Sequence, residues 1–229
     1  KMEAARRSRF DRSVVLDADV IVLTDVSELF DLLDKVDFAA TVSFSRDRGM
    51  MQPDADLPRS VPLFNSGVMV IRKSAAMDAF MTRWETEILK HRRGIDQPSL
   101  RRLLWDSDLQ VSPLPFEYNM TMVQFLPVWQ SWMGAPRILH TGKLTDEPVG
   151  DPLAPFRLED GVNAAHAAHI RALIDSDWSL GGNATLQPVH PDQQSLSVII
   201  SLQGRRLGRV FLRVVQFAKR NKPKTTSSK

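Results

Sequence analysis

Apolar and polar positions along the chain follow two periods, which predict strands followed by helices. Residues 13–23 (SVVLDADVIVL) are two β-branched runs separated by Asp-Ala-Asp, which predicts a buried, parallel strand that ends near Leu16. Further strands are predicted at 38–42, 63–71, 109–114 and 137–140. Residues 74–91 have the spacing of an amphipathic helix, with apolar side chains at Met77, Phe80, Met81, Trp84 and Ile88.

Strands that alternate with helices predict an α/β fold with a mostly parallel central sheet flanked by helices. We expect three segments: a catalytic domain at 1–150, a loop-rich extension at 151–192 with one helix near 162–174, and a basic tail at 193–229. The tail reads either as a strand and helix or as the start of a further domain. The chain begins with Lys, and a buried strand follows by residue 13, so we expect that the first strands of the domain are missing.

Composition excludes several kinds of chemistry. The chain has no cysteine, so disulfides, thiolate zinc sites and cysteine nucleophiles are excluded, and this fits a cytoplasmic protein. No apolar run reaches the roughly 18–20 residues that span a bilayer. Nine Lys or Arg residues and no acid follow Asp192, which leaves 21 basic against 27 acidic residues before it. The pI of about 9.4 is therefore a property of the tail and does not indicate a nucleic-acid-binding domain.

The basic tail can also be interpreted as a segment that binds a membrane surface. The sequence pattern predicts a basic amphipathic helix at about 206–220, and such helices bind the anionic inner face of a membrane. A helix packed on its own domain is the alternative.

Asp17 and Asp19 follow an apolar strand, where α/β sheets place ligand-binding groups. Two hard oxygen ligands suit Mg²⁺ or Mn²⁺, ions that commonly share a phosphate with the protein. An Asp-rich turn is the simpler alternative. A third is a haloacid-dehalogenase-type phosphatase with Asp17 as nucleophile and Asp19 as general acid/base. That class needs a later acidic pair at a strand end, and no convincing pair is present.

Three other groups are candidates for the same site. Asn65-Ser66-Gly67 lies inside an apolar strand, where it is either a bulge or a close backbone approach beside a sugar-binding wall. Asp96-Gln97 is either a helix cap or a contact to the transferred sugar. After the last strand comes His140-Thr141-Gly142-Lys143. Here the imidazole is either structural or a third metal ligand, Gly142 permits close approach, and Lys143 is a point charge for phosphate.

In order along residues 1 to about 144, these elements resemble the retaining glycosyltransferases of family 8, the glycogenin and lipopolysaccharide galactosyltransferase group. The matching pieces are Phe10-Asp11-Arg12 before VVLDADVIV, then DVSELF, FNSGVMVI, IDQP, LPFEYN and ILHTGK. One departure is clear: the family's last motif runs His-x-x-Gly with a Lys several residues later, whereas here Gly142 and Lys143 follow His140 closely.

The resemblance implies a GT-A fold, a nucleotide-diphosphate-sugar donor (a UDP-sugar) and Mn²⁺ or Mg²⁺ as cofactor. It implies Asp17, Asp19 and His140 as metal ligands and Asp96 and Gln97 as catalytic residues at the sugar. Donor-binding residues would be Lys1, Asp17, Asn65, Ser66, Gly67, Gly142 and Lys143. The acceptor would be a hydroxyl of a saccharide, a lipid-linked molecule or a protein, and the reaction would retain configuration by front-face attack. The phosphatase and a donor-binding domain without catalysis stay as alternatives.

Overall fold

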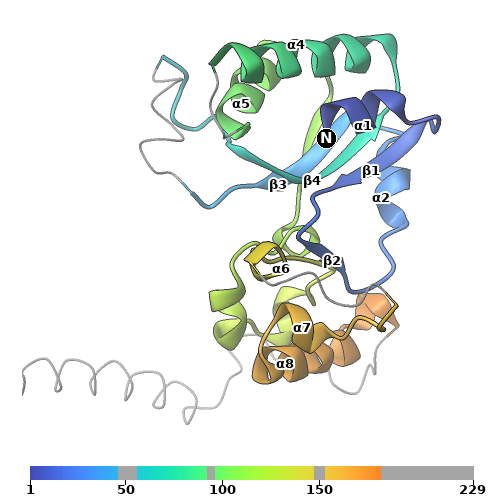
Figure 1. Cartoon of the computed structure of the whole chain (residues 1–229), viewed down its shortest axis with the longest axis vertical. Coiled ribbons are helices and arrows are strands. Elements are labelled where there is room, and N and C mark those ends of the chain that lie inside the picture. The colour runs from blue at the N-terminus through green and yellow to red at the C-terminus, as the bar shows by residue number, and fades with distance from the viewer. Residues whose placement is uncertain (46–55, 92–95, 147–152, 182–229) are drawn as a thin grey trace, which may run out of the picture.

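The computed structural model describes residues 1–45, 56–91, 96–146 and 153–181, so the predicted tail at 193–229 lies outside the described residues. A four-stranded sheet has the order β1-β4-β3-β5, formed by β1 (Arg12–Leu16), β4 (Phe64–Arg72), β3 (Phe38–Val42) and β5 (Val111–Leu114). A second sheet pairs β2 (Val20–Val22) with β6 (Ile138–His140). Figure 1 shows the first sheet in the upper half of the molecule and the second in the lower half.

The mixed α/β class is confirmed, but the mostly parallel sheet is wrong for the described strands. β4 runs antiparallel to both β1 and β3, and only β3 and β5 are parallel. The strand predicted to end near Leu16 does end there, as β1, but it is antiparallel to its neighbour β4; the second apolar run enters the other sheet as β2 at Val20. A strand with both faces buried is an apolar run in either direction, so its sequence carries no signal for the direction.

Helices cover both faces of the first sheet. On one face lie α1 (Met2–Arg7), α4 (Ala75–His91) and α5 (Gln97–Trp105), which form a core with alternate residues of β3 and β4, among them Phe38, Met69 and Ile71. On the other face α2 (Glu28–Leu32) packs against the residues between them, Ala39, Val68 and Val70. The predicted amphipathic helix at 74–91 is thus confirmed as α4, and its Met77, Phe80, Met81 and Trp84 are buried.

The second sheet rests on a third core, built mostly from residues after position 115. This part contains the 3₁₀ helices η2 (Phe116–Tyr118), η3 (Val123–Val128), η4 (Ser131–Met133) and η5 (Trp178–Leu180) and the α-helices α6 (Lys143–Asp146), α7 (Leu158–Gly161) and α8 (Ala164–Ser176). Ile170 and Leu173 of α8 share this core with Met120 and Leu139. Helix α8 confirms the helix predicted near 162–174. Among the described residues, no helix is long and apolar enough to cross a membrane.

Candidate active site

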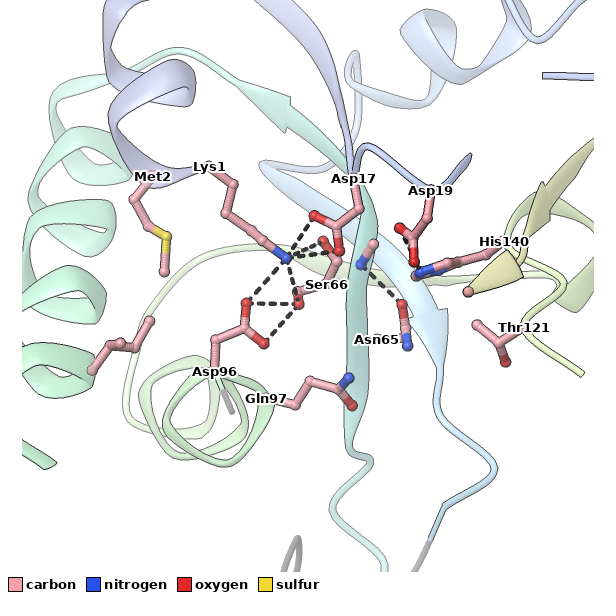
Figure 2. A pocket seen from close by; sticks show the side chains of 13 residues that line it. Lys1, Met2, Asp17, Asp19, Asn65, Ser66, Asp96, Gln97, Thr121 and His140 are labelled. Carbon is pink, nitrogen blue, oxygen red and sulfur yellow. Dashed lines mark hydrogen bonds and ion pairs between the residues drawn. The ribbon is translucent and has the colours of Figure 1, made fainter. Parts of the chain in front are cut away.

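A pocket of about 800 Å³ opens where the chain passes from the first sheet to the second. Figure 2 shows side chains from both sheets and from the start of α5 pointing into it. Its lining contains ten of the eleven predicted site residues: Lys1, Asp17, Asp19, Asn65, Ser66, Gly67, Asp96, Gln97, His140 and Gly142. Met2, Ile88 and Thr121, none of which was predicted as a site residue, complete it. Lys143 is not part of the lining; it is exposed at the start of α6.

Asp17, Asp19 and His140 offer three ligand atoms that all lie within 4.8 Å of one another. Their side chains are 28%, 20% and 15% exposed, so they face the pocket without being fully solvated. Carboxylate oxygens suit Mg²⁺ and Mn²⁺, and an imidazole nitrogen shifts the preference toward a transition metal such as Mn²⁺. The donor set therefore fits the divalent cation expected from the sequence. Three aspartates against one lysine in the lining give the pocket a negative charge that favours a cation.

Pairing between β2 and β6 brings the histidine to the aspartates. His140 lies opposite Val20 in the antiparallel register, and the Thr141 amide donates a hydrogen bond to Asp19 O at 3.0 Å. His140 Nε2 consequently lies 3.2 Å from Asp19 Oδ1. At the end of β1, the Asp17 amide donates to Gly67 O at 2.9 Å, which fixes the first aspartate to β4.

Asp96 is at the start of α5, but it is not a side-chain cap. The helix begins with Pro in its first turn, as expected, yet the Asp96 carboxylate makes no capping hydrogen bond. It accepts a hydrogen bond from Ser66 Oγ instead, at 2.9 Å to each carboxylate oxygen, and pairs with Lys1 Nζ at 3.1 Å. Asp96 is thus the N-cap residue by position, as predicted, but its side chain faces the pocket and does not cap the helix (Figure 2).

Lys1 connects the two acidic parts of the pocket. Its ammonium group lies 2.8 Å from Asp17 Oδ1 and donates to Ser66 Oγ at 3.1 Å, besides its contact with Asp96. The neighbouring Gln97 adds an unusual feature, because its Oε1 is buried and has no hydrogen-bond partner in the part of the chain that the structure describes. A buried carbonyl oxygen without a donor is costly, and in a pocket wall this points to a ligand that donates a hydrogen bond.

Gly67 makes the close backbone approach that its place in the strand predicted. A Cβ on this residue would lie 2.3 Å from His140 Cε1, so the imidazole packs directly on the backbone of β4. Gly142 differs, because a Cβ there would meet no described atom within 4 Å. The close approach expected at Gly142 is therefore not to another part of the described protein.

Asn119 is a residue near the site that the sequence analysis did not name. It is fully buried behind the pocket wall, and its side chain contacts both His140 and Asn65. The available signal was the polar Asn at the end of LPFEYN. That signal is weak alone, because the partners are 21 and 54 residues away in sequence.

The chain resembles known proteins over this same region. The family model described as nucleotide-diphospho-sugar transferase matches residues 12–147. Human glycogenin-2 is 26% identical over 204 residues, which cover 85% of this chain and 36% of that protein, so the chain spans about a third of this relative's length.

Solved structures of glycosyltransferases are similar at lower identity. The galactosyltransferase LgtC is 16% identical with a TM-score of 0.44, covering 74% of this chain and 62% of that chain. The glycosyltransferase GlyE of Streptococcus pneumoniae is 21% identical with a TM-score of 0.42, covering 75% and 44%. Mouse xyloside xylosyltransferase 1 is 18% identical with a TM-score of 0.43, covering 65% and 63%.

The family model covers more than half of the chain, from the first strand of the sheet to the helix that follows His140. It includes Asp17, Asp19 and His140 and excludes the haloacid-dehalogenase-type phosphatase as an interpretation of the Asp-x-Asp pair. The chain belongs to the nucleotide-diphospho-sugar transferase family.

Proposed function

We propose that this protein transfers a sugar from a nucleotide-diphosphate sugar, a UDP-sugar, to a hydroxyl group of an acceptor. The observation that supports it most is the convergence of three cation ligands with Asp96 and Gln97 in one pocket. A divalent cation held by a few carboxylates commonly shares its remaining positions with substrate phosphates. Membership of the nucleotide-diphospho-sugar transferase family supports the same donor class.

Asp17, Asp19 and His140 would hold Mn²⁺, or Mg²⁺ in its place. Bound there, the cation would neutralise the donor diphosphate and the charge that develops on the leaving oxygen. Lys1, whose ammonium group lies between Asp17 and Asp96, supplies further positive charge at the donor. Asn65 and Ser66 present an amide and a hydroxyl to the sugar.

The reacting carbon would lie beside α5. As the bond between the anomeric carbon and the diphosphate oxygen breaks, positive charge develops on the sugar ring. The Asp96 carboxylate and the unpaired Gln97 Oε1 stabilise that charge electrostatically. The acceptor oxygen bonds to the same carbon from the face that the diphosphate leaves, its proton passes to the departing diphosphate, and the configuration is retained.

The acceptor is proposed only as a class, a hydroxyl of a saccharide, a lipid-linked molecule or a protein. A lipid-linked acceptor would agree with contact between the basic tail and a membrane. The tail lies outside the described residues, and this part of the proposal rests on its sequence.

The test is donor turnover by the intact protein. UDP release from UDP-glucose and UDP-galactose would be measured with Mn²⁺, with EDTA, and for Asp19→Asn. We expect release that requires the metal, falls at least about 100-fold in Asp19→Asn, and gives a product whose anomeric configuration, read by NMR, matches the donor.

A donor-binding domain without catalysis predicts a different result. Such a protein would bind UDP in the presence of Mn²⁺ but release none from any UDP-sugar, with or without acceptors. That outcome would replace the transferase proposal by the binding alternative, and an inverted product would contradict the retaining mechanism alone.

A further inference from the structure

The Asn119 side chain lies behind the pocket and makes two hydrogen bonds, one through its Nδ2 and one through its Oδ1. Asn119 Nδ2 donates to Asn65 Oδ1 at 2.7 Å, and Asn119 Oδ1 lies 3.0 Å from His140 Nδ1. The residue is 0% exposed and does not line the pocket, so any effect it has on a ligand passes through its neighbours.

A backbone amide decides the direction of these bonds. The N–H of Gly67 can only donate, and it donates to Asn65 Oδ1 at 2.9 Å. Asn65 therefore presents a carbonyl oxygen to Asn119, and the NH₂ group of Asn119 donates the hydrogen bond to it. The other end of the Asn119 amide is then a carbonyl oxygen, which can only accept, so Nδ1 of His140 must carry the proton.

We propose that Asn119 is a positioning residue that keeps His140 protonated on Nδ1, so that the Nε2 lone pair is available to a divalent cation. Nε2 is the nitrogen on the pocket side, 3.2 Å from Asp19 Oδ1. Partners of the second ring nitrogen are known to fix the tautomer and orientation of metal-binding histidines. The inference rests on the proposed function, because it takes Asp17, Asp19 and His140 as the metal site.

The backbone holds Asn119 at this place. The next residue, Met120, donates to Ile138 O at 2.9 Å and accepts from the His140 amide at 3.1 Å, so the segment is aligned along β6. Asn65, on β4, then extends the chain of bonds to a second element. Backbone hydrogen bonds thus hold the segment of Asn119 beside β6, where its side chain contacts the His140 ring.

The inference can be tested with Mn²⁺ alone, by EPR of the free ion during titration of the intact protein. Asn119→Leu, similar in size but unable to bond, should weaken Mn²⁺ binding about 10- to 100-fold. Asn65→Ala should weaken it less, and its effect should shrink in the Asn119→Leu background, because Asn65 Oδ1 fixes the direction of the Asn119 amide. Ile138→Val is the matched control, a buried change in the same strand that leaves these bonds in place.

A second measurement needs no variant and remains decisive if Asn119→Leu fails to fold. In the Mg²⁺-loaded wild type, ¹⁵N correlation spectra of the imidazole should show the proton on Nδ1 of His140 and none on Nε2. A proton on Nε2 would overturn the inference, as would Mn²⁺ affinity that is unchanged in folded Asn119→Leu or independent effects of the two substitutions. If wild type binds no Mn²⁺, the metal site fails and the inference fails with it; if it binds normally and only the Asn119 results disagree, the proposed function stands.

Discussion

The His140 imidazole packs against the backbone of Gly67, at a separation that leaves no room for a side chain. A Cβ on Gly67 would be 2.3 Å from Cε1 and 2.4 Å from Nδ1 of the ring. Because real Cβ atoms do not approach other atoms so closely, glycine at this position is a requirement of the histidine's place beside Asp19.

Gly67→Ala should therefore weaken Mn²⁺ binding at least about tenfold, since the ring must move away from the two aspartates. Free Mn²⁺ measured by EPR gives the affinity, and far-UV circular dichroism checks the fold. Gly142→Ala is the matched control for Mn²⁺ alone, because a Cβ there meets no described atom within 4 Å. If Gly67→Ala binds Mn²⁺ as tightly as Gly142→Ala and wild type do, His140 does not contribute to the metal site.

Asp96→Asn and Gln97→Ala should lower kcat about 100-fold and leave the affinity for UDP within about threefold of wild type. Both side chains are placed to act on the sugar, and losing a contact made in the transition state lowers turnover rather than nucleotide binding. Steady-state kinetics and UDP titration separate the two effects. Ser99→Ala is the control at the same helix start, because Ser99 Oγ bonds the Asp96 carbonyl and no other group in the described part of the chain. Lost UDP affinity with normal turnover at saturation would contradict these roles.

Much of the local structure could be predicted from the sequence. The strand end at Leu16 and the helices at 75–91 and 164–176 follow from apolar periodicity, a short-range property of the chain. The direction of β4 could not, because a buried strand has the same apolar pattern in either direction.

Other features of the site depend on contacts between residues that are far apart in sequence, which the sequence pattern does not reveal. Asp96 reads as a cap from its neighbours, yet its carboxylate bonds Ser66, 30 residues earlier. Asn119 is one polar residue in a short motif until β6 brings His140 beside it. The sequence thus predicted most of the residues that line the pocket and missed Asn119, which lies behind its wall.

For the tail, we expect the intact protein to sediment with anionic phospholipid vesicles at low salt. The net positive charge of residues 193–229 attracts such a surface, and added salt screens the attraction. Deletion of 205–229 should abolish binding. Neutral phosphatidylcholine vesicles are the control, and failure of the intact protein to bind anionic vesicles would exclude the membrane interpretation.

Asp177 forms a buried ion pair that attaches the end of the described chain to the strand carrying His140. Its Oδ2 lies 3.2 Å from Arg137 Nη1 and accepts from the Ala135 amide at 2.8 Å, and both charged residues are buried. Burial alone would raise the pKa of Asp177. Hydrogen bonds from Ala135 and Ser179 and the charge of Arg137 outweigh that effect, so the pKa is lowered.

Asp177→Asn should lower the free energy of unfolding by about 3 kcal/mol at pH 7, because it leaves the Arg137 charge buried and uncompensated. A carboxyl whose folded-state pKa is lowered contributes stability above its unfolded pKa, about 3.9, and loses it as the pH falls through the folded value. The difference between wild type and variant in urea unfolding should therefore shrink below about pH 4. Asp175→Asn, an exposed residue of α8 just before Asp177, is the matched control and should change stability by less than about 0.5 kcal/mol. A loss of stability that is the same at pH 3 and pH 7 would mean that Asp177 acts through packing rather than through its charge.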